Sequence, residues 1–173
     1  MNLLKENPSI ARYFPEDALP YVEGFFREYR FHFKITKKRF SKLGDFRVEN
    51  GKKIPSISIN GNLNPYQFLF TFLHEIAHLI VHIKWKTAQP PHGEIWKDTF
   101  REILHVGLDL NVFPDDLTMA IKKYATNPKA STAADPRLVK ALNKYDENPD
   151  YLILEDIPSN QPFQLENGRR FIK

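Results

Sequence analysis

Apolar side chains dominate one stretch near the middle of the chain, Phe68 to Ile83, where nearly every position apart from the histidines, one threonine and one glutamate is hydrophobic. A helix that is apolar nearly all round its circumference is a buried one. The four residues before this stretch, Asn64-Pro65-Tyr66-Gln67, are typical of an N-cap, a proline in the first turn and a capping-box partner. We therefore predict a buried helix that begins at Asn64.

The segment before this helix shows two different patterns. Between Leu19 and Tyr29, hydrophobic residues recur at three- and four-residue spacing, which predicts an amphipathic helix with Asp17 as its N-cap. Residues 31–59 instead alternate apolar and polar side chains in short runs separated by turn residues. This period is typical of strands, so we expect two or three antiparallel strands there.

Three more helices are predicted after the central one. The first begins with residues 92–104, the second covers 115–124 with acids at its start and lysines at its end, and the third covers 135–145. From Tyr151 onward the pattern changes to short strands, with a turn at residues 166–168. The C-terminal part is therefore expected to be a β structure of its own.

These elements define the expected fold class and domain organisation. The fold class is α+β: an N-terminal helix, a small antiparallel sheet, the central helix, the helices that follow it and a short C-terminal β appendage. We assign residues 1–147 to the main domain and residues 148–173 to a β-hairpin appendage. A chain of 173 residues is long enough for one domain with a proper core.

The composition and the N-terminus indicate the cell compartment in which we expect the protein. The chain has no cysteine, which excludes disulfides and thiolate metal sites and fits a reducing compartment. The N-terminus lacks the apolar core of a signal peptide, and His74, Glu75 and His78 interrupt the buried helix, so that helix is not a membrane span. We expect a cytoplasmic protein that has no membrane partner.

The positive charge is concentrated in one part of the predicted sheet. The whole chain carries a net charge of +4, whereas residues 34–53 hold eight lysines and arginines against Asp45 and Glu49. Such a run is either a solvated strand face whose lysines discourage edge pairing or a hairpin that contacts nucleic acid. The candidate DNA-contacting residues are Lys34, Lys37, Lys38, Arg39, Lys42 and Arg47.

The central helix carries the strongest chemical signal, His74-Glu75-Ile76-Ala77-His78. Two histidines four residues apart project from the same face of a helix, one turn apart, and can reach a single metal ion. Glu75 lies beside that ion without ligating it, where it can accept a proton from the water that the metal activates. A metal also satisfies polar side chains that would otherwise be costly to bury.

A catalytic zinc usually takes three protein ligands and a water molecule, so a third ligand is needed. His82 lies on the same stripe, but on a straight helix its Cα is ~12 Å from that of His74, too far for both rings to share one ion. His92 follows a loop that is long enough to reverse the chain direction and precedes the next helix. We therefore predict His92 as the third metal ligand.

An acidic stripe on the next helix offers an alternative ligand. Glu94, Asp98 and Glu102 recur every four residues, and one of them could supply the carboxylate found in another class of zinc peptidases. A solvated acidic face is the simpler reading for at least two of them.

The motif His74-Glu75-x-x-His78, followed by His92-Gly93-x-x-Trp96 after a basic strand region, resembles the SprT-like (Spartan-related) zinc metallopeptidases. The resemblance covers residues 18–105. It implies a zincin-like fold, zinc on His74, His78 and His92, and a catalytic Glu75. Eukaryotic members cut proteins crosslinked to DNA, so the resemblance also implies protein substrates that are associated with DNA.

The sequence departs from this family at its C-terminus. Many members carry a cysteine-containing zinc ribbon there, and this chain has no cysteine. The ribbon is lost, lies outside this sequence or is replaced by the strands from Tyr151 onward, and each alternative weakens the case for independent DNA binding.

Two further functions compete with zinc-dependent peptide hydrolysis. The first is a nucleic-acid-binding module with a structural zinc site and no peptidase activity, which the basic region supports but which would not need Glu75. The second is a zinc hydrolase that acts on a small amide or on one specific partner protein.

Overall fold

The computed structural model describes residues 7–48, 51, 53–85, 89–147, 154–165 and 168–173. In chain order its elements are α2 (Pro8–Ala11), the 3-10 helix η1 (Glu16–Ala18), α3 (Leu19–Glu28), β1 (His32–Thr36), β2 (Gly44–Arg47), β3 (Ser56–Asn60), α4 (Pro65–Lys84), α5 (Glu94–Asp109), α6 (Asp115–Ala125), η2 (Thr132–Ala134), α7 (Pro136–Asn143), η3 (Leu154–Asp156), β4 (Pro162–Gln164) and β5 (Arg170–Ile172). The fold is a mixed α+β architecture, as the sequence predicts.

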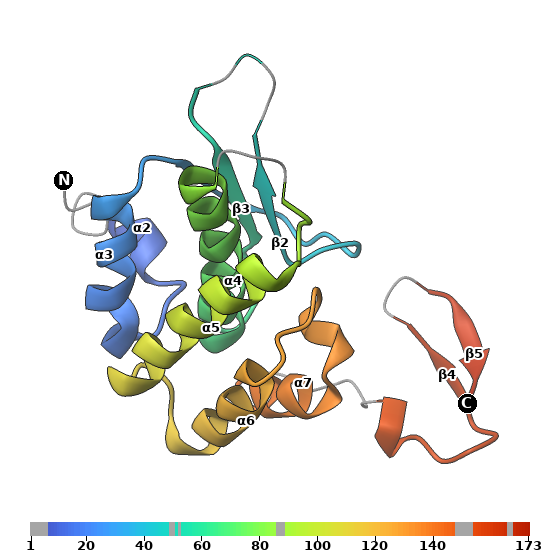
Figure 1. Cartoon of the computed structure of the whole chain (residues 1–173). Coiled ribbons are helices and arrows are strands. Elements are labelled where there is room, and N and C mark those ends of the chain that lie inside the picture. Colours follow the sequence, from blue (N-terminus) through green and yellow to red (C-terminus); the bar gives the residue numbers. More distant parts are fainter. Residues whose placement is uncertain (1–6, 49–50, 52, 86–88, 148–153, 166–167) are drawn as a thin grey trace.

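The helix α4 lies at the centre of the molecule and contacts β2, β3, α5 and α7 (Figure 1). Most of its side chains are buried, including all the aromatic ones from Phe68 to Phe72. Its position explains why the sequence is apolar nearly all round: one side packs on the sheet and the other on helices. In the described part of the chain no helix meets the length and hydropathy that crossing a bilayer requires.

The start of α4 confirms the predicted N-cap and corrects one detail. The Asn64 side chain accepts hydrogen bonds from the backbone N–H groups of Tyr66 and Gln67, and its amide donates to the Leu142 carbonyl. The Gln67 side chain does not complete a capping box but donates to Asn143 Oδ1. Asn64 therefore joins α4 to α7 and also satisfies two free backbone N–H groups in the first turn of α4.

The sheet is mixed, so the prediction of an antiparallel sheet is wrong for one strand pair. The strand order is β1-β3-β2, with β1 parallel and β2 antiparallel to β3. The central strand β3 carries Ile57 and Ile59, both fully buried against α4 and the core. Alternation identifies a strand, but it does not say which neighbour the strand pairs with or in which direction.

An aromatic cluster attaches the N-terminal helices to α4. Phe14 packs edge-on against Phe68 and Phe72 with ring centroids 5.0 and 5.2 Å apart, and Phe26 stacks on Phe72 at 5.5 Å. The amphipathic helix forms as α3, but Asp17 lies inside η1 and its side chain does not cap α3.

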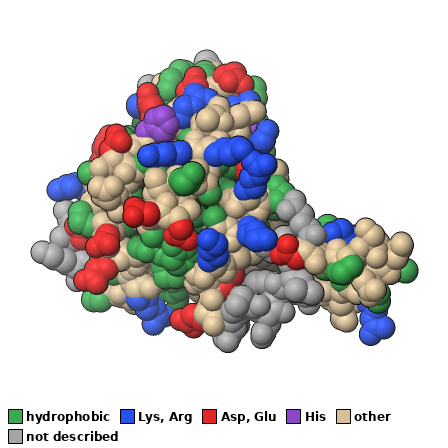
Figure 2. All heavy atoms as spheres, turned by 90° about the horizontal axis from the view of Figure 1, so that it is seen from below, with side chains coloured by type: hydrophobic (Ala, Val, Ile, Leu, Met, Phe, Trp, Pro, Cys, Tyr) green, Lys and Arg blue, Asp and Glu red, His purple; other side chains and the backbone are tan. Residues whose placement is uncertain are grey.

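The C-terminal strands β4 and β5 form an antiparallel hairpin that stands apart from the main body (Figures 1 and 2). The predicted strand from Tyr151 falls mostly on residues 151–153, outside the described residues, and Leu154 begins η3 instead. The boundary that we place between residues 147 and 148 also adjoins a segment outside the described residues, so it stays a prediction.

Candidate metal centre

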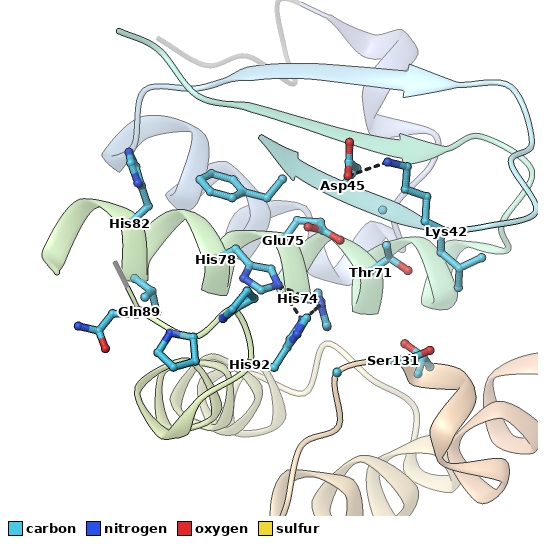
Figure 3. A pocket seen from close by; sticks show the side chains of 18 of the residues that line it. Lys42, Asp45, Thr71, His74, Glu75, His78, His82, Gln89, His92 and Ser131 are labelled. Carbon is cyan, nitrogen blue, oxygen red and sulfur yellow. Dashed lines mark hydrogen bonds and ion pairs between the residues drawn. The ribbon is translucent and has the colours of Figure 1, made fainter. Parts of the chain in front are cut away.

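Three imidazole rings meet where α4 passes the start of α5. His74 and His78 project from one face of α4, and His92 lies just before Gly93, the N-cap of α5. Figure 3 shows the three rings turned toward one another. His92 therefore lies against the two helical histidines, as the sequence predicts.

The spacing of the ring nitrogens fits a metal ion. The Nε2 atoms of His74 and His78 lie 3.3 Å apart, those of His78 and His92 3.1 Å, and those of His74 and His92 3.4 Å. Three nitrogens bound at ~2.0–2.1 Å in tetrahedral geometry would be about 3.3 Å apart. These residues form a group that could hold a metal ion.

The electrostatics of the rings favour metal binding. Burial lowers the pKa of His74 to about 3 and that of His78 to about 4, and burial also lowers the pKa of His92. All three rings are therefore neutral at pH 7, which is the form that binds a metal. Three neutral rings whose Nε2 atoms converge cannot all satisfy one another by hydrogen bonds, because each bond needs one protonated nitrogen.

Trp96 packs against all three rings. Its ring centroid lies 4.7 Å from that of His74, 5.2 Å from His78 and 4.6 Å from His92, and the His78 ring is nearly parallel to it. Trp96 is 1% exposed, and its Nε1 has no hydrogen-bond partner in the described structure. The sequence marks Trp96 as a packing residue of the helix α5 and as part of the family motif, and its contacts with the three histidine rings explain a large aromatic side chain at this position.

Glu75 is buried between α4 and β2. Burial raises its pKa to about 8, and the nearby Asp45 adds to that rise. The backbone N–H of Phe46 donates a hydrogen bond to the carboxylate, and Arg39 and Lys42 act in the same direction, lowering the pKa. Glu75 lines the same cleft as the three histidines but does not belong to the group that could hold a metal ion.

A glycine in β2 makes this burial possible. A Cβ atom added at Gly44 would lie 2.4 Å from Glu75 Oε1 and 2.7 Å from Thr71 Cγ2. No side chain fits there without displacing the carboxylate. Sequence reasoning missed Gly44, because nothing in the chain pattern places a β2 residue against the middle of α4.

The histidines and Glu75 line a cleft of about 700 Å³. One wall is residues 41–46 of β2 and the loop before it, the floor is α4 and the opposite wall comes from residues 89–92 and 130–132. Figure 3 shows Lys42 and Ser131 toward one end and His82 and Gln89 toward the other. The cleft thus runs along α4 from Thr71 to Trp85 at its C-cap.

The other candidate ligands lie away from the three rings. His82 is exposed and sits near the Phe46 ring, with centroids 5.8 Å apart. Glu94 pairs with Lys97, and Asp98 with Arg101, all on the surface of α5; Glu102 is exposed as well. Among the described residues, the acidic stripe therefore contributes no ligand to the His group.

The basic residues do not form one hairpin, because β3 separates β1 from β2. Arg39 is held by Asn60 Oδ1 at 2.7 Å and by Ser58 Oγ at 3.0 Å, and Asp45 pairs with both Lys42 and Arg47. Arg39, Lys42 and Arg47 thus have partners within the chain, and the Lys38 ammonium group lies 5.4 Å from the centroid of the Phe40 ring. Lys34, Lys37 and Lys38 are exposed near β1, and a role for them in DNA contact stays a prediction.

Comparison with known families supports the metallopeptidase interpretation. Residues 30–96 match the family model Peptidase_M78, the IrrE N-terminal-like domain. That region contains the sheet, α4 and His92, but it is less than half of the chain. No curated protein and no solved structure shows significant similarity. The chain is therefore similar to a metallopeptidase family, and the match does not single out the SprT-like group.

Proposed function

We propose that this protein is a zinc-dependent metallopeptidase that hydrolyses peptide bonds in its cleft. The observation that carries the proposal is the convergence of three neutral imidazoles beside a buried glutamate on the floor of an open cleft. Three nitrogen ligands and an accessible fourth side are typical of catalytic zinc sites. The match to Peptidase_M78 and the resemblance to SprT-like enzymes both include the helix α4, which carries His74 and His78.

His74, His78 and His92 would hold the ion through Nε2. When bound, zinc supplies Lewis acidity, makes a water molecule nucleophilic near neutral pH and favours the ionised form of a nearby carboxyl group. The carboxylate of Glu75 then accepts the proton of the attacking water and passes it to the leaving amine. The Phe46 N–H, by hydrogen-bonding the carboxylate, orients it for this transfer.

The sheet supports a peptide as the substrate. The strand β2 is at the edge of the three-stranded sheet, and Gly44, Asp45 and Phe46 line the cleft. Apart from the Phe46 N–H, which bonds the Glu75 carboxylate, an edge strand has backbone groups that its own sheet leaves unpaired, and an extended peptide can form hydrogen bonds with them. DNA-associated proteins are one substrate class for this activity, which the exposed lysines near β1 would favour.

The substitution Glu75→Gln tests the proposal. The variant should bind one zinc per chain as the wild type does, and should lose at least about 100-fold of its cleavage rate on a peptide library, because the proton acceptor is gone. Glu94→Gln is the matched control, since Glu94 is an exposed carboxylate that pairs with Lys97 on the surface of α5. A Glu75→Gln variant with zinc bound and full proteolysis would refute the mechanism.

A further inference from the structure

The cleft has an apolar end, formed by the last turns of α4. Val81 and Trp85 follow His78 by three and seven residues, so they share its face of the helix and line the same cleft. Trp85 continues the helical turn, because its backbone N–H bonds the Val81 carbonyl at 2.9 Å. Val81 is buried, whereas Trp85 is 37% exposed. Both side chains therefore line the cleft that also contains the metal ligands.

Two other segments complete this apolar end. From β2, Phe46 stacks on the His78 ring with a centroid distance of 6.2 Å and an interplanar angle of 14°. From the loop before α5, Pro90 and Pro91 line the cleft next to His92. Together with Val81 and Trp85 these residues make an apolar wall that begins at the His78 ring; we call it the Trp85 wall.

The opposite end of the cleft is polar. Thr71, Ser131 and Thr132 line it, together with Lys42, which pairs with Asp45 at 2.8 Å. Figure 3 places Lys42 and Ser131 there, and His82 and Gln89 beside the apolar end. The described residues that line the Trp85 wall carry no full charge, so a charged substrate side chain would find no ion-pair partner on it.

We infer that the Trp85 wall is a specificity subsite that accepts a large apolar side chain of the substrate, next to the peptide bond that is cut. This inference rests on the proposed function, because it identifies the substrate class of the same site. A peptide that pairs with β2 passes directly over Phe46, so its neighbouring side chain reaches the wall. Burying a Phe or Leu side chain in place of Ala should strengthen binding by about 10- to 100-fold.

The test measures peptide binding without cleavage. Zinc-loaded Glu75→Gln protein is used to select peptides from a random displayed library. The best peptide and its apolar-to-Ala derivative are then titrated by calorimetry. In the Glu75→Gln protein, replacing the apolar residue by Ala should weaken binding at least about tenfold. Adding Trp85→Ala to this protein should reduce the ratio of the two dissociation constants, Ala derivative over selected peptide, to under about threefold. Adding Trp85→Phe instead should retain most of the ratio.

Ile83→Ala is the matched control. Ile83 is on the same turn of α4, is 42% exposed and does not line the cleft, so the ratio should stay at its original value. The inference is overturned if no peptide is selected, if the selected peptides favour a charged or small residue, or if Trp85→Ala leaves the ratio unchanged. Glu75-dependent proteolysis without any apolar preference would overturn the subsite alone and leave the proposed function intact.

Discussion

At the scale of single residues, the site depends on a close approach between a backbone and a carboxylate. Gly44 brings β2 so near to α4 that Glu75 is buried yet still lines the cleft. The same approach gives Glu75 its hydrogen bond from the Phe46 N–H and the desolvation that raises its pKa. Gly44 therefore positions the proposed proton acceptor although it carries no functional group.

Gly44→Ala should reduce proteolysis by at least about tenfold while zinc content stays at one per chain. The added methyl group would overlap Glu75 Oε1, so either the carboxylate or β2 must move. Zinc analysis and cleavage rates on the same preparation check this prediction. The control is Gly24→Ala in α3, where nothing lies within 4 Å and the substitution should stabilise the protein by up to about 1 kcal/mol. Equal activity of both variants would contradict the role of Gly44.

The lowered pKa values of the histidines predict that metal affinity depends only weakly on pH. Protons compete with the metal only below the ring pKa, which is about 3 for His74 and about 4 for His78, and is also lowered for His92. Three ordinary imidazoles with pKa near 6.5 would together lose about 10⁴-fold in affinity between pH 7 and pH 5. Here the loss should stay below about 25-fold. Co²⁺ titrations followed by visible absorbance at both pH values measure it, and a 10⁴-fold loss would show that the rings are not desolvated.

At the scale of elements, α4 positions most of the candidate site and connects it to the core. Its N-terminus is fixed to α7 through Asn64, which also donates a 2.6 Å hydrogen bond to Asp146 Oδ1. Its middle carries His74, His78 and Glu75, and its C-terminal end contributes Val81 and Trp85 to the Trp85 wall. One helix thus joins the hydrophobic core to the whole floor of the cleft.

Asn64→Ala should lower the free energy of unfolding by about 2 kcal/mol or more, because it removes both the cap of α4 and the hydrogen bonds to the α7 end. Urea denaturation measures the change. Asp135→Ala is the comparison: Asp135 caps α7 through the N–H groups of Arg137 and Leu138, so it should lose only about 1 kcal/mol. If both variants lost the same amount, the hydrogen bonds from Asn64 to the α7 end would contribute nothing measurable.

The sequence predicts those elements whose signal is local. The capped helix α4, the helices that follow it and the β4–β5 hairpin each carry their own periodicity and turn residues, and all of them form. The return of His92 to α4 also follows from local signals, because a proline-containing loop precedes it. The parallel pairing of β1 with β3, the contact of Gly44 with Glu75 and the support by Trp96 depend on tertiary packing, which no single segment encodes.

At the scale of the whole molecule, the candidate site draws on segments that are far apart in the sequence. The cleft takes residues from β2, α4, the start of α5 and the loop before η2, so it exists only in the folded main body. The C-terminal hairpin lines none of it in the described structure. Acidic and basic side chains are both spread over the face seen in Figure 2. The proposed function therefore rests on the residues of the cleft and not on a charged surface on that face.

The central claim is that one metal ion is held by His74, His78 and His92. Zinc titration of the metal-free protein, with His92→Ala and His82→Ala as variants, tests it most directly. We predict one zinc per chain for the wild type and for His82→Ala. His92→Ala should lose more affinity than the 10- to 100-fold typical of an outer-shell partner. A His92→Ala variant that binds zinc as tightly as the wild type would contradict the claim.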